Sequence, residues 1–274
     1  ATLAPLAKAP TMDGRIGPDE YKLAASVPGF QGIRQFGPLD PRAARTFVGF
    51  TRDTLHIAVE TELPPDGSLL QRFESRDFYS AGDDSIEIWI DPHRANRRSG
   101  EGDRSFIHLI ANFAGVISDA KFDPDRGAPD LGWNGDWTFE NTVDPERGTW
   151  VAELSIPFRE FGWDKGTAIG REIGLIIGRN WKRPGGQMTS WYWRGAYAHD
   201  VARYPTFLLT ADGPVVQVTQ LGDVHDGKLD VNVEVRNPAA EARKAKVHLR
   251  VESSDTPAID KKREMTIPAG GMVD

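Results

Sequence analysis

The segment DDSIEIWID at residues 83–91 places a carboxylate and an indole on one face of a chain that alternates like a β-strand. Successive side chains of a strand point to opposite faces, so the three isoleucines share one face while Glu87 and Trp89 share the other. A carboxylate accepts hydrogen bonds from hydroxyl groups, and an aromatic ring offers a flat, rigid apolar surface. This face is therefore either a platform for a hydroxyl-bearing ligand or a second buried layer under a loop.

The sequence shows no catalytic constellation. It contains no G-x-S-x-G elbow, Walker loop, H-E-x-x-H pair or dinucleotide glycine motif. Glu87 and Asp91 lie roughly 13 Å apart along a strand, which exceeds the ~5–9.5 Å that separates the two carboxylates of a glycosidase. We expect that the chain is not an enzyme and that any catalytic domain belongs to another part of a larger multidomain protein.

Two acidic segments of the sequence are candidates for metal binding. Asp83 and Asp84 precede the strand, and carboxylate oxygens are ligands that Ca²⁺ prefers. The segment 123–130 begins like a calcium loop but lacks the later residues of an EF-hand. The sequence has no cysteine, which excludes disulfides, thiolate metal sites and iron–sulfur clusters. Calcium is therefore the metal ion that the sequence leaves open for this loop and strand start.

Charge and hydropathy limit the partners. The net charge of −7 argues against binding to nucleic acid, and no apolar run reaches the ~20 residues that a membrane span requires. The Ala- and Pro-rich residues 1–8 are typical of a linker that follows a removed export signal. We therefore expect an extracellular, periplasmic or cell-surface location.

Short strands separated by turns dominate the chain. Turn signals rich in Pro, Gly and Asp recur every 8–15 residues, which is typical of an antiparallel β-sandwich or jelly roll. In the segment 149–158, Trp150 shares a face with three aliphatic residues and is expected in the core. All eight tryptophans lie in residues 1–193, and residues 213–274 change to strict alternation. We predict a sandwich over 9–212, followed by a partial or small immunoglobulin-like domain or spacer over 213–274.

The order of several segments resembles the family 9 carbohydrate-binding modules, a DOMON-like β-sandwich family. The segments that carry the resemblance are APTMDGRIGPDEY, TLHIAVETE, GDDSIEIWID, LIANFAGVISDAKFD, TWVAELSIPFREFGW, REIGLIIGRNWKR and TSWYWRGAYAHDVARYPTFLL. The resemblance covers about residues 9–212 and implies a non-catalytic domain of a secreted or surface polysaccharide-processing protein. Its partner would be a polysaccharide or oligosaccharide.

The resemblance also implies a set of contact residues. Sugar-binding members clamp a sugar between two tryptophans, whose positions fall on Ala81 and about Ala198 here, with Tyr79 and Tyr197 nearby. A basic contact of the family falls on Ile110. Together with the aromatic segment TSWYWRGAY, the predicted ligand set is Tyr79, Glu87, Trp89, Asn112, Arg179, Asn180, Trp191, Trp193 and Tyr197. We expect these side chains to converge on one concave surface, as ligand sites do.

Two alternatives remain at this point. The alanines at both clamp positions favour a structural or interaction module that has kept the sandwich and lost the sugar site. The second alternative is a haem-binding domain, since DOMON-type cytochromes resemble this fold. Such a domain needs an axial pair, for which His108 and Met188 are the best-placed candidates.

Overall fold

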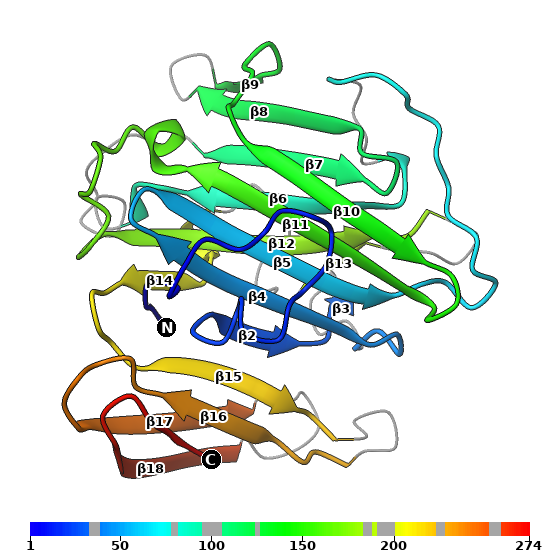
Figure 1. Cartoon of the computed structure of the whole chain (residues 1–274). Helices are drawn as coiled ribbons and strands as arrows, with labels where there is room; N and C mark the ends of the chain where they lie inside the picture. The colour runs from blue at the N-terminus through cyan, green and yellow to red at the C-terminus, as the bar shows by residue number, and fades with distance from the viewer. Residues whose placement is uncertain are drawn as a thin grey trace.

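The computed structural model shows a β-sandwich with a small additional hairpin, which confirms the predicted all-β, mainly antiparallel fold (Figure 1). The residues that the structure describes are 1–32, 39–77, 82–94, 106–123, 127–182, 188–190, 201–222, 228–251 and 259–274. The helices whose full extent is described are two short 3-10 helices, η2 (Phe158–Phe161) and η3 (Val201–Arg203). None of the described helices is long and apolar enough to cross a membrane.

The first sheet carries at its centre the strand β6, which lies within the segment 83–91. Its strands, in spatial order, are β1 (Thr2–Leu3), β14 (Thr206–Leu209), β12 (Glu172–Asn180), β6 (Ser85–Asp91), β7 (Ile107–Asn112), β8 (Ile117–Asp123) and β9 (Ala128–Asp130). Two further strands, β13 (Met188–Ser190) and β3 (Gln31–Gly32), extend the sheet beside one end of β12.

The second sheet packs against the first. Its strands, in order, are β10 (Thr138–Asp144), β11 (Thr149–Pro157), β5 (Thr54–Glu62), β4 (Ala44–Thr51), β2 (Ala25–Pro28), β15 (Val215–Gln220), β16 (Asn232–Arg236) and β19 (Met272–Val273). The remaining strands, β17 (Arg243–Val251) and β18 (Ile259–Ile267), form a separate antiparallel hairpin.

The core lies between the two sheets and follows the alternation in the sequence. The three isoleucines of β6 and the aliphatic residues of β4, β5, β11 and β12 point into it. Trp150 is fully buried there, as expected, and its ring lies 6.2 Å from that of Trp181. The core is therefore built from the apolar face of each strand, and the opposite face of each sheet is turned away from the core.

Both ends of the chain contribute strands to the sandwich. Near the N-terminus, Leu3 is fully buried and pairs in parallel with Leu209 of β14. After residue 213, β15 joins the second sheet through a parallel contact between Gln217 and Ser26, and β16 and β19 follow it. The division of the chain into a linker, a sandwich and a third unit stays a prediction.

Candidate functional site

The strand register defines which side chains lie on the outer face of the first sheet, the face turned away from the second sheet. Glu87 is paired with Ile110 on β7 and with Gly178 on β12. Trp89 is paired with His108 on β7 in the same way. Directly paired residues share a face, and the isoleucines between them fill the core. Glu87, Trp89 and His108 therefore lie together on the outer face.

These three side chains form a compact polar and aromatic cluster. The ring of Trp89 stacks on that of His108, with centroids 4.8 Å apart and an interplanar angle of 10°. His108 Nε2 lies 3.5 Å from Glu87 Oε1, within ion-pair distance. Glu87 is 1% exposed, yet its Oε1, Trp89 Nε1 and His108 Nε2 make no hydrogen bond with any residue that the structure describes.

An apolar layer adjoins this cluster on the outer face. Trp89 packs there with Phe106, Ile176 and Tyr204, all of which are buried. The sequence left open whether this face is a ligand platform or a second buried layer. In the described residues, the Trp89 side chain belongs to a second buried layer. Glu87 Oε1 and His108 Nε2 lie beside it, 3.5 Å apart and without a hydrogen bond.

Asn112 also lies on the outer face, but its amide is fully used within the protein. Its Nδ2 donates to Asp83 Oδ2 at 2.9 Å, and its Oδ1 accepts from the backbone N–H groups of Ala114 and Val116. Asn180 lies on the same face and donates to Ser85 Oγ at 3.0 Å. The structure thus gives both amides structural hydrogen bonds.

Asp83 and Asp84 are structural acceptors. Asp83 accepts from the backbone N–H groups of Arg72 and Phe73, and Asp84 accepts from those of Leu70 and Lys182. All four carboxylate oxygens therefore face N–H donors, which repel a cation rather than coordinate it. The described residues also contain no group of three His, Asp or Glu side chains that could hold a metal. This arrangement does not fit a calcium site.

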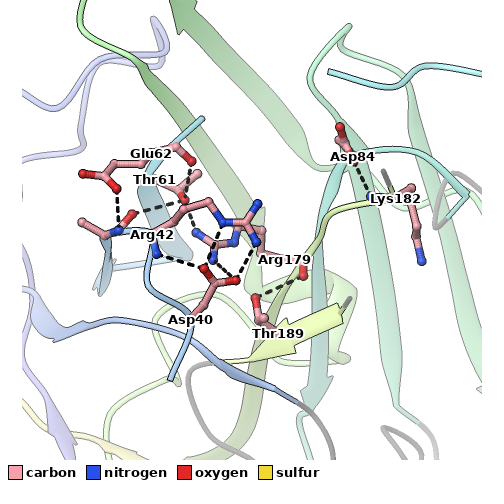
Figure 2. Close-up of polar contacts among 9 residues, drawn as sticks. Asp40, Arg42, Thr61, Glu62, Asp84, Arg179, Lys182 and Thr189 are labelled. Atoms are coloured by element: carbon pink, nitrogen blue, oxygen red, sulfur yellow. Dashed lines mark hydrogen bonds and ion pairs between the residues drawn. The ribbon is translucent and has the colours of Figure 1, made fainter. Parts of the chain in front are cut away.

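Arg179 corrects the predicted ligand set, because it projects from the opposite face of β12. It is paired with Ile86, which points into the core, and its side chain is 0% exposed. Figure 2 shows its guanidinium directed toward Asp40, with an ion-pair distance of 3.0 Å, and toward the hydroxyl of Thr61. Arg179 and Glu87 are therefore separated by the sheet and cannot contact one ligand.

The surroundings of Arg179 show why a buried cation is tolerated. Its guanidinium lies over the rings of Phe30 and Trp181, at 5.0 Å and 5.1 Å from their centroids. Burial lowers the pKa of Arg179 to about 10, and the charge of Asp40 opposes that shift. Burial would raise the pKa of Asp40, but hydrogen bonds from Arg42 and the charge of Arg179 outweigh it and hold that pKa below its ordinary value.

The remaining predicted residues lie outside the described ranges. These are Tyr79, Trp191, Trp193 and Tyr197, with the clamp positions Ala81 and Ala198. The strand β13 that carries Met188 is separated from β7 and His108 by β12 and β6. The sequence predicts His108 only as a haem ligand and not as a sugar contact, although it lies beside Glu87. Its position four residues before Asn112 in an alternating strand is the signal that places it on the same face.

Comparison with known proteins supports the fold. No family model matches the sequence, and no curated protein matches it. Among solved structures, a family 9 carbohydrate-binding module from Caldicellulosiruptor kristjanssonii in complex with glucose is similar, with a TM-score of 0.53 and 13% identity over 78% of this chain and 96% of that one. A family 9 module of the same organism in complex with cellotriose has a TM-score of 0.55 and 13% identity, over 78% of this chain and 95% of that one.

A second similar structure comes from another organism. A carbohydrate-binding protein of Bacteroides uniformis, assigned that role provisionally, has a TM-score of 0.57 and 12% identity over 76% of this chain and 98% of that one. These matches confirm the predicted resemblance to the family 9 modules at the level of fold. The class that these matches define is thus one of fold, the β-sandwich that this chain shares with the three solved structures.

Proposed function

We propose that this protein is a non-catalytic carbohydrate-binding domain whose ligand contacts the outer face of the first sheet beside Glu87. The fold is that of modules solved with glucose and cellotriose. On this chain, the observation that carries the proposal is the Glu87 carboxylate, which is buried and has an oxygen without a hydrogen bond in the described structure.

The chemistry of the cluster favours a ligand rich in hydroxyl groups. Leaving a buried polar atom without a hydrogen bond costs about 1–3 kcal/mol, so a partner that satisfies several such atoms gains affinity. Glu87 Oε1 can accept a hydrogen bond from a sugar hydroxyl, and Trp89 Nε1 can donate one to a sugar oxygen. A carboxylate-bearing ligand would be repelled by Glu87, and a hydrocarbon would leave the polar atoms unpaired.

The proposed contact set differs from the sequence prediction in three respects. Arg179 is removed, because it lies in the core, and Asn112 is removed, because its amide is hydrogen-bonded within the protein. His108 is added beside Glu87. Aromatic stacking by Tyr79, Trp191, Trp193 and Tyr197 remains part of the proposal. We further propose that the domain serves a secreted, periplasmic or surface protein that processes polysaccharides.

The proposal is tested by isothermal titration and affinity gel electrophoresis with glucose, cellotriose and a panel of soluble polysaccharides. Glu87→Gln keeps the side-chain size and removes the charge, and we expect at least tenfold weaker binding. Glu140→Gln is the matched control, because Glu140 is exposed on β10 of the other sheet. Absence of binding to every glycan, or equal affinity of E87Q and the wild type, would contradict the proposal.

A structural or interaction module is the second candidate. The hydrogen bonds of Asn112, Asp83 and Asp84 favour it, because these side chains already bind backbone groups and one another and so serve the fold. If no glycan binds while the protein is fully folded, this candidate replaces the first. A Soret band in the purified protein would instead support the haem-binding alternative.

A further inference from the structure

We propose a second ligand-binding site, a groove on the outer face of the second sheet that takes a stretch of an uncharged oligosaccharide or polysaccharide. It goes beyond the proposed function, because it lies on the opposite side of the sandwich from Glu87. The residues that line it are all within the described part of the chain.

The groove has a volume of about 1180 Å³, which exceeds the ~300–1,000 Å³ of a typical small-molecule site. It is bounded by residues 14–22, by the turn between β10 and β11, and by β15 and β16. Its floor is formed by outward-facing residues of β4 and β5, since Arg45 is paired directly with Glu60. A space of this size suits several linked sugar units better than a single small molecule.

One wall of the groove is held in place by a buried carboxylate. The segment that follows β1 lies across the strands of the second sheet, as the dark blue trace in Figure 1 shows. Glu153, which is 0% exposed, accepts from the backbone N–H groups of Asp13, Gly14 and Arg15 and from the hydroxyl of Tyr21 at 3.0 Å. The wall is therefore fixed before a ligand arrives, which lowers the entropy cost of binding.

Donors and acceptors lie next to one another along the groove. Arg45 stacks over the ring of Phe47 at 4.9 Å, and its neighbour Glu60 lies 3.9 Å from Arg147. Farther along, Arg236 pairs with Glu234 on β16. The Nε atoms of Arg45 and Arg236 have no hydrogen-bond partner in the described structure, so neither guanidinium is saturated by the protein.

The balance of charge identifies the class of ligand. The lining contains five basic and five acidic residues: Arg15, Lys22, Arg45, Arg147 and Arg236, and Asp19, Glu60, Asp144, Glu146 and Glu234. A polyanion would meet repulsion from the carboxylates and a polycation from the arginines. A hydroxyl group both donates and accepts, so vicinal hydroxyls match neighbouring carboxylate and guanidinium groups. An uncharged glycan is therefore favoured over nucleic acid or an acidic polymer.

The experiment isolates this groove by weakening the first site. The E87Q protein is titrated calorimetrically with cellohexaose, xylohexaose and maltohexaose, and with polygalacturonate as the acidic comparison. We expect one saturable site for a neutral hexasaccharide, weakened at least tenfold by adding Arg45→Met and Glu60→Gln. Methionine preserves much of the packing of Arg45 on Phe47, and unchanged thermal unfolding shows that the sandwich is intact.

The outcomes separate the two proposals. Loss of all binding in E87Q overturns the groove and leaves the proposed function standing. Binding by E87Q that is lost on changing Arg45 and Glu60 supports the groove, and a weaker glycan affinity of E87Q than of the wild type supports the site at Glu87 independently. Tighter binding of polygalacturonate than of the neutral hexasaccharides, or no neutral ligand bound by E87Q, overturns the groove proposal.

Discussion

The buried pair of Asp40 and Arg179 offers the sharpest test of how this sandwich is held together. Asp40→Asn removes the negative charge, and Arg179→Met removes the positive charge while keeping an apolar stem in the core. Arg179 is 0% exposed, and its guanidinium lies over the rings of both Phe30 and Trp181. Asp40 has a second cationic partner, Arg42, whose Nε and Nη2 donate to it at 2.9 Å and 2.8 Å.

This difference in partners predicts unequal effects on stability. In D40N the buried guanidinium loses its ion-pair partner and keeps the hydroxyl of Thr61, so the free energy of unfolding should fall by about 3–5 kcal/mol. In R179M, Asp40 keeps its hydrogen bonds from Arg42, and the loss is that of a cation stacked on aromatic rings and one ion pair. We expect roughly 1–2 kcal/mol for this variant.

The free energies are measured by urea denaturation followed by tryptophan fluorescence, and the double variant D40N/R179M completes the cycle. We expect the double variant to be more stable than D40N, because no unpaired buried cation remains. A smaller effect of D40N than of R179M would refute the reasoning. So would a folded R179M protein that has lost glycan affinity, since Arg179 lies on the face away from Glu87.

Two further predictions concern pH and backbone geometry. Burial lowers the pKa of His56 from 6.5 to about 4, so on acidification the unfolded chain takes up a proton before the folded protein does. The free energy of unfolding should therefore fall by roughly 3 kcal/mol between pH 6.5 and pH 4. His56→Gln should reduce this dependence on pH in urea denaturation, and an unchanged dependence would contradict the role given to His56. Gly14 has a φ of 72°, and an added Cβ would lie 2.4 Å from the Asn141 carbonyl carbon, so Gly14→Ala should cost roughly 1–3 kcal/mol. Gly115→Ala is the control, because Gly115 has a φ of 83° and an added Cβ there would have nothing within 4 Å. If the melting temperatures of the two variants fall equally, the contact with Asn141 is not the cause of the loss.

Several features of the fold follow from the sequence alone. The alternation in 83–91 determines that the isoleucines share a face and that Glu87 and Trp89 share the other, because side chains of a strand alternate whatever its neighbours are. The same rule predicts the burial of Trp150 in β11. Recurrent turn signals between short apolar segments predict an all-β sandwich, since such segments can bury their apolar faces only by pairing and stacking.

The tertiary structure decided which residues from different strands meet. Alternation within a strand does not say which residue of the next strand lies opposite, and a shift of one residue reverses every face. The pairing of Arg179 with Ile86 placed that arginine in the core, where Asp40 neutralises it, and not beside Glu87. Likewise, the groove on the second sheet exists because residues 14–22 cross that sheet and are fastened to Glu153, a contact between segments about 140 residues apart that no local pattern encodes.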